Sequence, residues 1–162
     1  MALRKIVMDG DPILKKRTRE VTAFDSRLHS LIDDMRETLA EAAGLGLAAP
    51  QVGVMRRVAI VVDDEENMIE IINPEIISAE DETDGAEGCL SFPDIWGVVQ
   101  RPYKVTVRAQ DRFGKFFEVS GEAITARAFC HEIDHLNGVV FTELVLRYIT
   151  AEEVAEMRSD DE

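Results

Sequence analysis

The chain has 162 residues, 46% of them hydrophobic, and its 18 basic against 32 acidic residues give a formal net charge of −14. This length predicts one domain, residues 1–162, with enough apolar side chains to form a core without disulfide support. The acidic excess argues against direct DNA binding, because phosphate backbones are held mainly by clustered Lys and Arg.

The apolar stretches are too short to enter a membrane. The longest aliphatic run, Val58–Val62, is far below the roughly 20 residues that span a bilayer, so we expect no membrane association. The N-terminus becomes charged at Arg4 and Lys5 before a secretory signal could form, which predicts a cytoplasmic protein. Two cysteines, Cys89 and Cys130, are too few for a disulfide scaffold, so a metal or redox role has to be considered.

The first predicted element is an N-terminal helix over about 25–43, where Leu, Ile and Met recur at helical spacing. Asp25 or Ser26 can cap this helix, and Gly44 is expected to end it. The basic run Lys15–Arg19 ahead of it is interpreted as a solvated loop without an assigned function.

Two hairpins are predicted in the middle of the chain. The first joins Val58–Val62 to Met68–Ile72 and ends at Asn73-Pro74, and the second joins strands over 105–109 and 116–119. Successive hairpins, rather than alternating strands and helices, predict an α+β fold with antiparallel sheets.

Two further helices are predicted in the C-terminal third. One covers about 122–136 and is expected to lie centrally, with the antiparallel sheets packed around it. The other is short and acidic and begins near Thr150, where Thr150 and Glu153 have the spacing of a capping box.

The central predicted helix carries an H-E-x-x-H motif, residues 131–135. Because residues follow one another by about 100° around a helix, His131, Glu132 and His135 share one half of its surface and face the core. Two imidazoles one turn apart can bind one metal ion. The alternative is a pair of histidines with ordinary hydrogen bonds.

A hydrolytic metal site usually has three protein ligands and one open position, so a third ligand is needed. Cys89, in the extended segment 87–93, is the leading candidate. Cys130 directly precedes His131 and projects about 100° away from it, so it is interpreted as a packing residue. His29, on the first helix, is expected at the surface or partly packed. One thiolate and two imidazoles suit Fe²⁺, Zn²⁺, Co²⁺ or Ni²⁺.

The glycine-rich segment also fits, nominally, the fingerprint of a dinucleotide-binding loop through Gly44, Gly46 and Ala49. That fingerprint needs a strand before it and a helix after it. Here a helix precedes the segment and Pro50 hinders a following one, so this alternative is rejected.

Three separated segments resemble the peptide deformylases, and they are Gly44–Gly53, Glu87–Ser91 and His131–Gly138. Their order and spacing are similar to the bacterial form, and the resemblance extends from Asp11-Pro12 to Phe141. It implies a metal-dependent hydrolase that removes the N-formyl group from the initiator formyl-methionine of nascent polypeptides and releases formate. The catalytic core is then expected to end near Phe141, followed by an acidic segment over 142–162.

The resemblance also implies residue roles. The metal, Fe²⁺ rather than Zn²⁺, would be held by Cys89, His131 and His135. Glu132 would take a proton from the attacking water and pass it to the leaving amine. Gln51 and the backbone N–H of Leu90 would donate hydrogen bonds to the developing oxyanion. Substrate contacts are implied at Leu45, Gly46, Gly88 and Ile124.

Some positions depart from the family or stay open. Cys130 stands where many deformylases have glutamine, and Trp96 is interpreted either as a rim contact or as a partly buried residue. Some bacterial members dock on the ribosome through a basic C-terminal helix, whereas residues 151–162 here are acidic, which argues against docking by that route. A zincin-like metallopeptidase and a non-catalytic binding protein on the same fold are the alternative functions.

Overall fold

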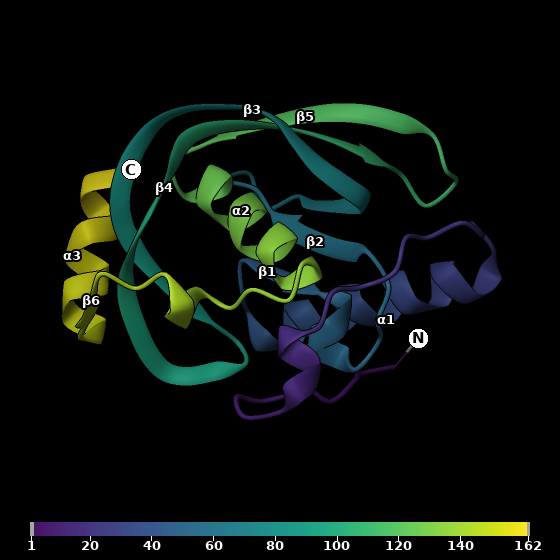
Figure 1. Ribbon diagram of the computed structural model, residues 1–162, viewed down its shortest axis with the longest axis horizontal. Helices are drawn as coiled ribbons and strands as arrows, with labels where there is room; N and C mark the ends of the chain where they lie inside the picture. Colours follow the sequence, from purple (N-terminus) through teal and green to yellow (C-terminus); the bar gives the residue numbers. More distant parts are fainter. Residues whose placement is uncertain (1, 162) are drawn as a thin grey trace.

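Two long antiparallel strands determine the shape of the molecule. In the computed structural model, which describes residues 2–161, β3 (Met68–Cys89) and β4 (Phe92–Gln110) are joined by the short turn at Leu90-Ser91. Together they curve over the central helix α2 (Ile124–Leu136), while β1 and β2 lie on its other side (Figure 1). The H-E-x-x-H motif, residues 131–135, lies on α2.

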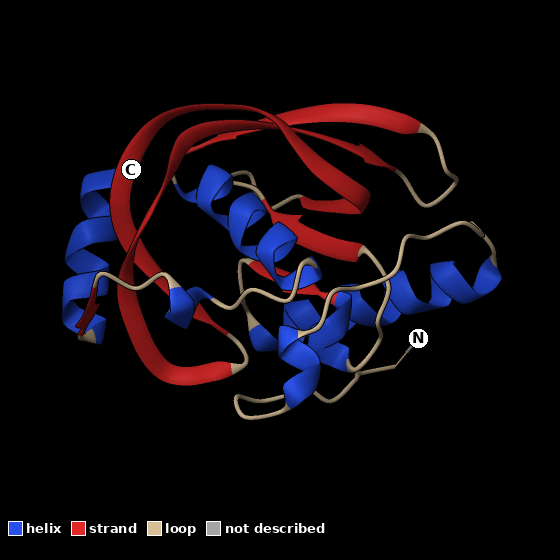
Figure 2. Cartoon of the chain, viewed as in Figure 1, coloured by secondary structure: helices blue, strands red, loops and turns tan. Residues whose placement is uncertain are grey.

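All strand pairs of the described sheet are antiparallel, which confirms the predicted α+β class (Figure 2). The strand order is β1-β2-β3-β4-β5, and β6 pairs with β4. The strands form one continuous sheet rather than separate sheets. The reason is that β3, the second strand of the first hairpin, pairs with β4, the first strand of the second hairpin. The remaining strands are β1 (Gly46–Ala48), β2 (Val58–Val62), β5 (Phe116–Glu122) and β6 (Arg147–Ile149).

The predicted end of the first hairpin at Asn73-Pro74 is wrong, because β3 continues through this dipeptide. The register shifts between Ile72 and Glu75, and Asn73 adopts a left-handed φ of 51°. Such a bulge accommodates a residue that cannot donate to the ladder, as Pro74 cannot. The Asn73 side chain stabilises the bulge by accepting from the Val21 N–H at 2.8 Å and donating to the Val21 carbonyl at 2.9 Å.

The N-terminal helix α1 (Ser26–Ala42) packs its apolar stripe against β1 and β2. Asp25 caps it by accepting from the Leu28 N–H at 3.1 Å, as predicted. The predicted end at Gly44 is one residue late, because Ala43 takes the left-handed C-cap conformation with φ 55°. Gly44 serves a different purpose: a Cβ there would lie 2.9 Å from Leu90 Cδ1, so the absent side chain lets this segment approach the β3–β4 turn.

The basic run Lys15–Arg19 is exposed at its four charged residues, as predicted, whereas Thr18 is buried. The Thr18 N–H and hydroxyl both donate to the carbonyl of Leu136, at 2.9 Å each. These hydrogen bonds connect the C-terminal end of α2 to the N-terminal part of the chain. The short helix η1 (Pro12–Lys15) precedes the segment and shares Lys15 with it.

The chain beyond Phe141 returns to the sheet. After η3 (Phe141–Glu143), β6 pairs with β4, placing Ile149 opposite Trp96. The helix α3 (Ala151–Asp161) then packs beside β3 and β4 (Figure 1). The predicted capping box is present, because the Glu153 N–H donates to Thr150 Oγ1 at 3.3 Å and the Thr150 N–H to Glu153 Oε1 at 3.4 Å. Among the described residues, no helix is long and apolar enough to cross a membrane.

Candidate metal centre

The three predicted metal ligands come together in the structure. The sulfur of Cys89 and the ring nitrogens of His131 and His135 lie within 4.8 Å of one another. Cys89 ends β3, and the two histidines lie one turn apart on the buried face of α2. Both histidines are buried, as the helical pattern predicts.

The donor set fits a divalent transition metal. Ligand bonds of about 2.0–2.3 Å in tetrahedral geometry place the ligand atoms about 3.3–3.8 Å apart. Cys89 Sγ lies 3.3 Å from His135 Nε2, within this range. The residues present are therefore suited to hold such an ion.

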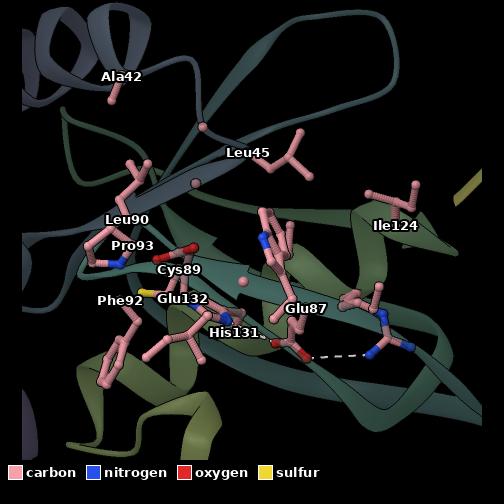
Figure 3. Close-up of a pocket in the computed structure, with 18 of the residues that line it drawn as sticks. Ala42, Leu45, Glu87, Cys89, Leu90, Phe92, Pro93, Ile124, His131 and Glu132 are labelled. Carbon is pink, nitrogen blue, oxygen red and sulfur yellow. Dashed lines mark hydrogen bonds and ion pairs between the residues drawn. The ribbon is translucent and has the colours of Figure 1, made fainter. Parts of the chain in front are cut away.

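A buried carboxylate orients the first histidine. His131 Nδ1 lies 2.8 Å from Glu87 Oε1 (Figure 3). Because an ionised carboxylate only accepts hydrogen bonds, Nδ1–H is the donor and the lone pair of Nε2 faces the other ligands. A carboxylate at this position fixes the tautomer and makes the imidazole a better ligand.

Two arginines and an aspartate extend this contact. Arg101 donates to both Glu87 oxygens, at 2.7 and 3.2 Å, and to Asp134 at 2.6 Å. Arg127 lies 3.4 Å from Glu87 and donates to the Val99 carbonyl at 2.7 Å. Burial alone would raise the pKa of Glu87, but the hydrogen bonds and charges of His131 and Arg101 lower it to about 2. The Glu87 carboxylate thus stays ionised although it is buried.

Glu132 lies beside the ligands without joining them. Its side chain is buried, and its Oε1 atom has no hydrogen-bond partner among the described residues. Burial raises its pKa to about 7, which suits a group that accepts and returns a proton near neutrality. A cation bound by the neighbouring ligands favours the carboxylate form and lowers this pKa.

The glycine-rich segment holds Glu132 in place. A Cβ on Gly46 would collide with the Glu132 side chain, at 2.8 Å from both its Cγ and Cδ atoms. Only glycine therefore lets β1 approach this carboxylate so closely. The same segment ends in η2 (Ala49–Val52), a single turn of 3-10 helix, and not in the long helix that a dinucleotide-binding loop requires.

Gln51 links the glycine-rich segment to the ligand-bearing turn. Its side-chain amide donates to Ser91 Oγ at 3.1 Å and to Cys89 Sγ at 3.5 Å, and its Oε1 accepts from the Ala48 N–H at 3.0 Å. Leu90 lies at the turn directly after Cys89. The side-chain amide of Gln51 thus lies beside the Cys89 sulfur.

A pocket of about 360 Å³ opens beside the candidate ligands. It extends from the turn at Leu90 to Ile124 at the start of α2 (Figure 3). Every site residue predicted from the sequence except His135 lines it: Leu45, Gly46, Gln51, Gly88, Cys89, Leu90, Ile124, His131 and Glu132.

The candidate ligand cluster does not include Trp96, Cys130 or His29. Trp96 is half-buried and lines the pocket, and a Cβ on Gly88 would run into its ring. Cys130 packs in the core, where burial raises the pKa of its thiol to about 11. His29 is partly packed, as predicted, with Nε2 2.8 Å from the Arg112 carbonyl oxygen. Both cysteines are free thiols.

Sequence analysis did not identify Glu87, Arg101, Arg127 or Asp134 as parts of the site. Glu87 and Asp134 are neighbours of predicted ligands, but Arg101 and Arg127 carry no motif of their own. A signal did exist: a charged residue inside an apolar run, as Arg127 is within the α2 stripe, needs a buried partner.

Replacing Glu87 by glutamine tests the support of His131. We expect metal affinity to fall about 10- to 100-fold, because the neutral amide holds the imidazole N–H less strongly. The measurement is competition with a chelator at neutral pH, alongside thermal unfolding to separate loss of folding from loss of metal. Glu118→Gln, on the exposed face of β5, is the matched control. Equal metal affinity in the two variants would contradict the assignment.

Comparison with known proteins identifies the family of this chain. The polypeptide deformylase family model matches residues 3–148. A peptide deformylase of Caldicellulosiruptor bescii is 53% identical over 159 residues, covering 98% of this chain and 95% of that one. A crystal structure of a peptide deformylase from Legionella pneumophila has a TM-score of 0.84 at 42% identity, covering 98% and 93% of the two chains. One from Acinetobacter baumannii with Met-Ala-Ser bound has a TM-score of 0.83 at 35% identity, covering 88% and 98%. The chain belongs to the polypeptide deformylase family.

Proposed function

We propose that this protein removes the N-formyl group from the initiator formyl-methionine of nascent polypeptides and releases formate. Family membership supplies the reaction class. The observation that carries the proposal for this chain is the cluster of Cys89, His131 and His135, with Cys89, His131 and the adjacent Glu132 lining one pocket.

Cys89, His131 and His135 would hold one divalent metal ion, and we propose Fe²⁺, with Zn²⁺, Ni²⁺ and Co²⁺ as ions that the same ligands accept. When bound, the ion polarises the formyl oxygen and makes water a stronger nucleophile at neutral pH. The Glu87 hydrogen bond to His131 supports ligation by fixing the imidazole.

The proton transfers are assigned to Glu132. Its carboxylate accepts a proton from the attacking water and then donates it to the nitrogen of the departing amine. Gln51, whose amide lies 3.5 Å from Cys89 Sγ, and the backbone N–H of Leu90 are proposed to donate hydrogen bonds to the oxygen that becomes negative as water adds. The hydrogen bond from Gln51 to Ser91 supports this role because it holds the amide beside Cys89.

We propose that the peptide lies along β1. This strand comes last in the strand order beyond β2, so its outer edge is open to an added strand, and Gly46 on it lines the pocket. Leu45, Gly88 and Ile124 supply further contacts along the same pocket. The Met-Ala-Ser peptide bound by the Acinetobacter relative is consistent with a peptide ligand of this kind.

The decisive experiment compares Fe²⁺-loaded and Zn²⁺-loaded protein, prepared without oxygen, in formate release from formyl-Met-Ala-Ser. We expect turnover with both ions and faster turnover with Fe²⁺. The matched unformylated peptide is the control, and its internal cleavage without formate release would instead indicate a metallopeptidase. Stoichiometric metal binding without either activity would indicate a non-catalytic binding protein.

The protein is proposed to act in the cytoplasm, since its substrates are nascent chains and a thiol ligand such as Cys89 needs reducing conditions. We also propose that it meets these chains by diffusion rather than by ribosome docking through its C-terminus. The acidic side chains Glu152, Glu153 and Glu156 of α3 support this view, because they are exposed or half-exposed and would repel RNA.

Gly46→Ala tests the contact between β1 and Glu132. The added Cβ must displace the carboxylate, so we expect formate release to fall about 10²-fold while metal content stays unchanged. Formate release and metal content are measured on the same preparation. Ser30→Ala, at an exposed position of α1, serves as the control. Full activity of Gly46→Ala would show that Glu132 needs no fixed position.

A further inference from the structure

The N-terminal segment connects two residues of the site that are 40 positions apart in the sequence. The backbone N–H of Val7 donates to the Gln51 carbonyl at 2.7 Å, and that of Asp9 donates to the Ser91 carbonyl at 2.8 Å. The side chains of Gln51 and Ser91 are themselves joined by a hydrogen bond of 3.1 Å. Residues 7–9, Gln51 and Ser91 therefore form a closed ring of hydrogen bonds.

This ring is buried beside the candidate ligands. Gln51 is 1% exposed and Ser91 is 0% exposed. Gln51 Nε2 lies 3.5 Å from Cys89 Sγ, and Ser91 is two residues after Cys89 in the chain. Val7 packs against the core cluster that contains Phe92, and Cys89 packs against the same cluster. A shift of residues 7–9 would therefore move the Gln51 amide relative to the Cys89 sulfur.

The segment is also held at both ends by contacts outside the ring. Upstream, the Arg4 N–H donates to Thr38 Oγ1 of α1 at 2.9 Å, and its guanidinium pairs with Asp34 at 2.9 Å. Downstream, the chain turns, and the Asp11 N–H donates to the Met8 carbonyl at 3.2 Å. Because both ends are fixed, the segment can hold its two partner residues in a set arrangement.

We propose that residues 7–9 are a positioning element for the reaction, because their backbone N–H groups fix the Gln51 amide relative to the turn that follows Cys89. This inference rests on the proposed function, in which Gln51 donates to the developing oxyanion. Such a donor has to lie within hydrogen-bond distance of that oxygen, so a displacement of about 1 Å already slows the reaction. Since the oxyanion develops only in the transition state, the effect is expected on kcat and not on KM.

Asp9→Pro removes one of the two N–H donors. Asp9 holds the second position of the turn that the Asp11 N–H closes, and Gly10 at the third position has φ 99°. This is the pattern of a type II turn, which accepts proline at its second position. The reference is Asp9→Ala, which loses the same carboxylate but keeps the N–H. In formate release from formyl-Met-Ala-Ser by the metal-loaded protein, we expect kcat to be about ten-fold lower in Asp9→Pro than in Asp9→Ala, with equal KM and metal content.

Asp64→Pro is the matched proline control. Asp64 is exposed and holds the second position of another turn, in which the Glu66 N–H donates to the Asp63 carbonyl at 3.1 Å. Its kcat should equal that of the unaltered protein. Where the proline at position 9 prevents folding, a backbone ester made with the hydroxy acid of alanine at that position removes the same N–H, and its kcat is compared with that of Asp9→Ala.

Combination with Gln51→Ala separates positioning from a general loss of stability. In that background Asp9→Pro should lower kcat by no more than about two-fold, because the amide that residues 7–9 position is absent. A hydrogen bond that only stabilises the fold would lower the unfolding temperature and leave kcat unchanged. Equal kcat in Asp9→Pro and Asp9→Ala would overturn the inference, and so would a ten-fold fall that persists in the Gln51→Ala background.

A measurement without turnover tests the same inference independently of the proposed function. Solvent exchange of the Gln51 side-chain amide protons, followed by NMR, should be about ten-fold faster in Asp9→Pro than in Asp9→Ala. Equal exchange rates would contradict the positioning of this amide by residues 7–9. Formate release by the unaltered protein reports on the proposed function separately.

Discussion

Replacing Glu132 by alanine is expected to leave the metal bound and to slow formate release by about 10²–10⁴-fold or more. The reason is geometric: Glu132 is buried in the pocket and adjacent to His131, but the ligand cluster consists of Cys89, His131 and His135. Metal analysis and formate release on one preparation measure the two properties. Ile133→Val, which changes the neighbouring position but removes no proton acceptor, is the control. Unchanged turnover would exclude Glu132 from proton transfer.

The pH dependence of turnover tests the role of Glu132 in a second way. A carboxyl group must be ionised to accept a proton, so turnover should fall as the pH drops through the pKa of Glu132. That pKa is raised to about 7 by burial and is lowered again by a bound cation, so the acid limb is expected below pH 7. In Glu132→Gln the limb due to this group should disappear from the residual rate.

The second large effect is expected at Cys89. In Cys89→Ala the site keeps two imidazoles and loses its thiolate, so the metal content should fall from about one ion per chain to a small fraction, and activity with it. Cys130→Ala is the control, because it removes the other thiol, which is buried in the core cluster around α2. Metal content and activity of that variant should remain. Full metal content in Cys89→Ala would contradict the ligand assignment.

Local sequence patterns predicted the elements that carry the site. The apolar spacing of α1, the β2–β3 and β4–β5 hairpins and the H-E-x-x-H helix all follow from periodicity and turn residues. The ligand cluster also followed, because two histidines one turn apart need a third partner and Cys89 was the leading candidate. These predictions depend on residues close together in sequence or on the chemistry of one ion.

What the sequence did not predict depends on contacts between distant segments. The continuation of β3 through Asn73 is stabilised by Val21, 52 positions away, and no local pattern indicates such a contact. The Arg101 contacts with Glu87 and Asp134 bridge a strand and a helix in the same way.

The separation of the ligands along the chain also has a kinetic consequence. Cys89 and His135 are 46 positions apart and meet only after β3, β4 and α2 have packed. Folding that depends on such distant pairings is slow, typically milliseconds to seconds for a sheet-rich chain. A metal ion therefore finds its complete ligand set late in folding. In a refolding experiment, metal uptake should follow the formation of the sheet and mark the completion of the native state.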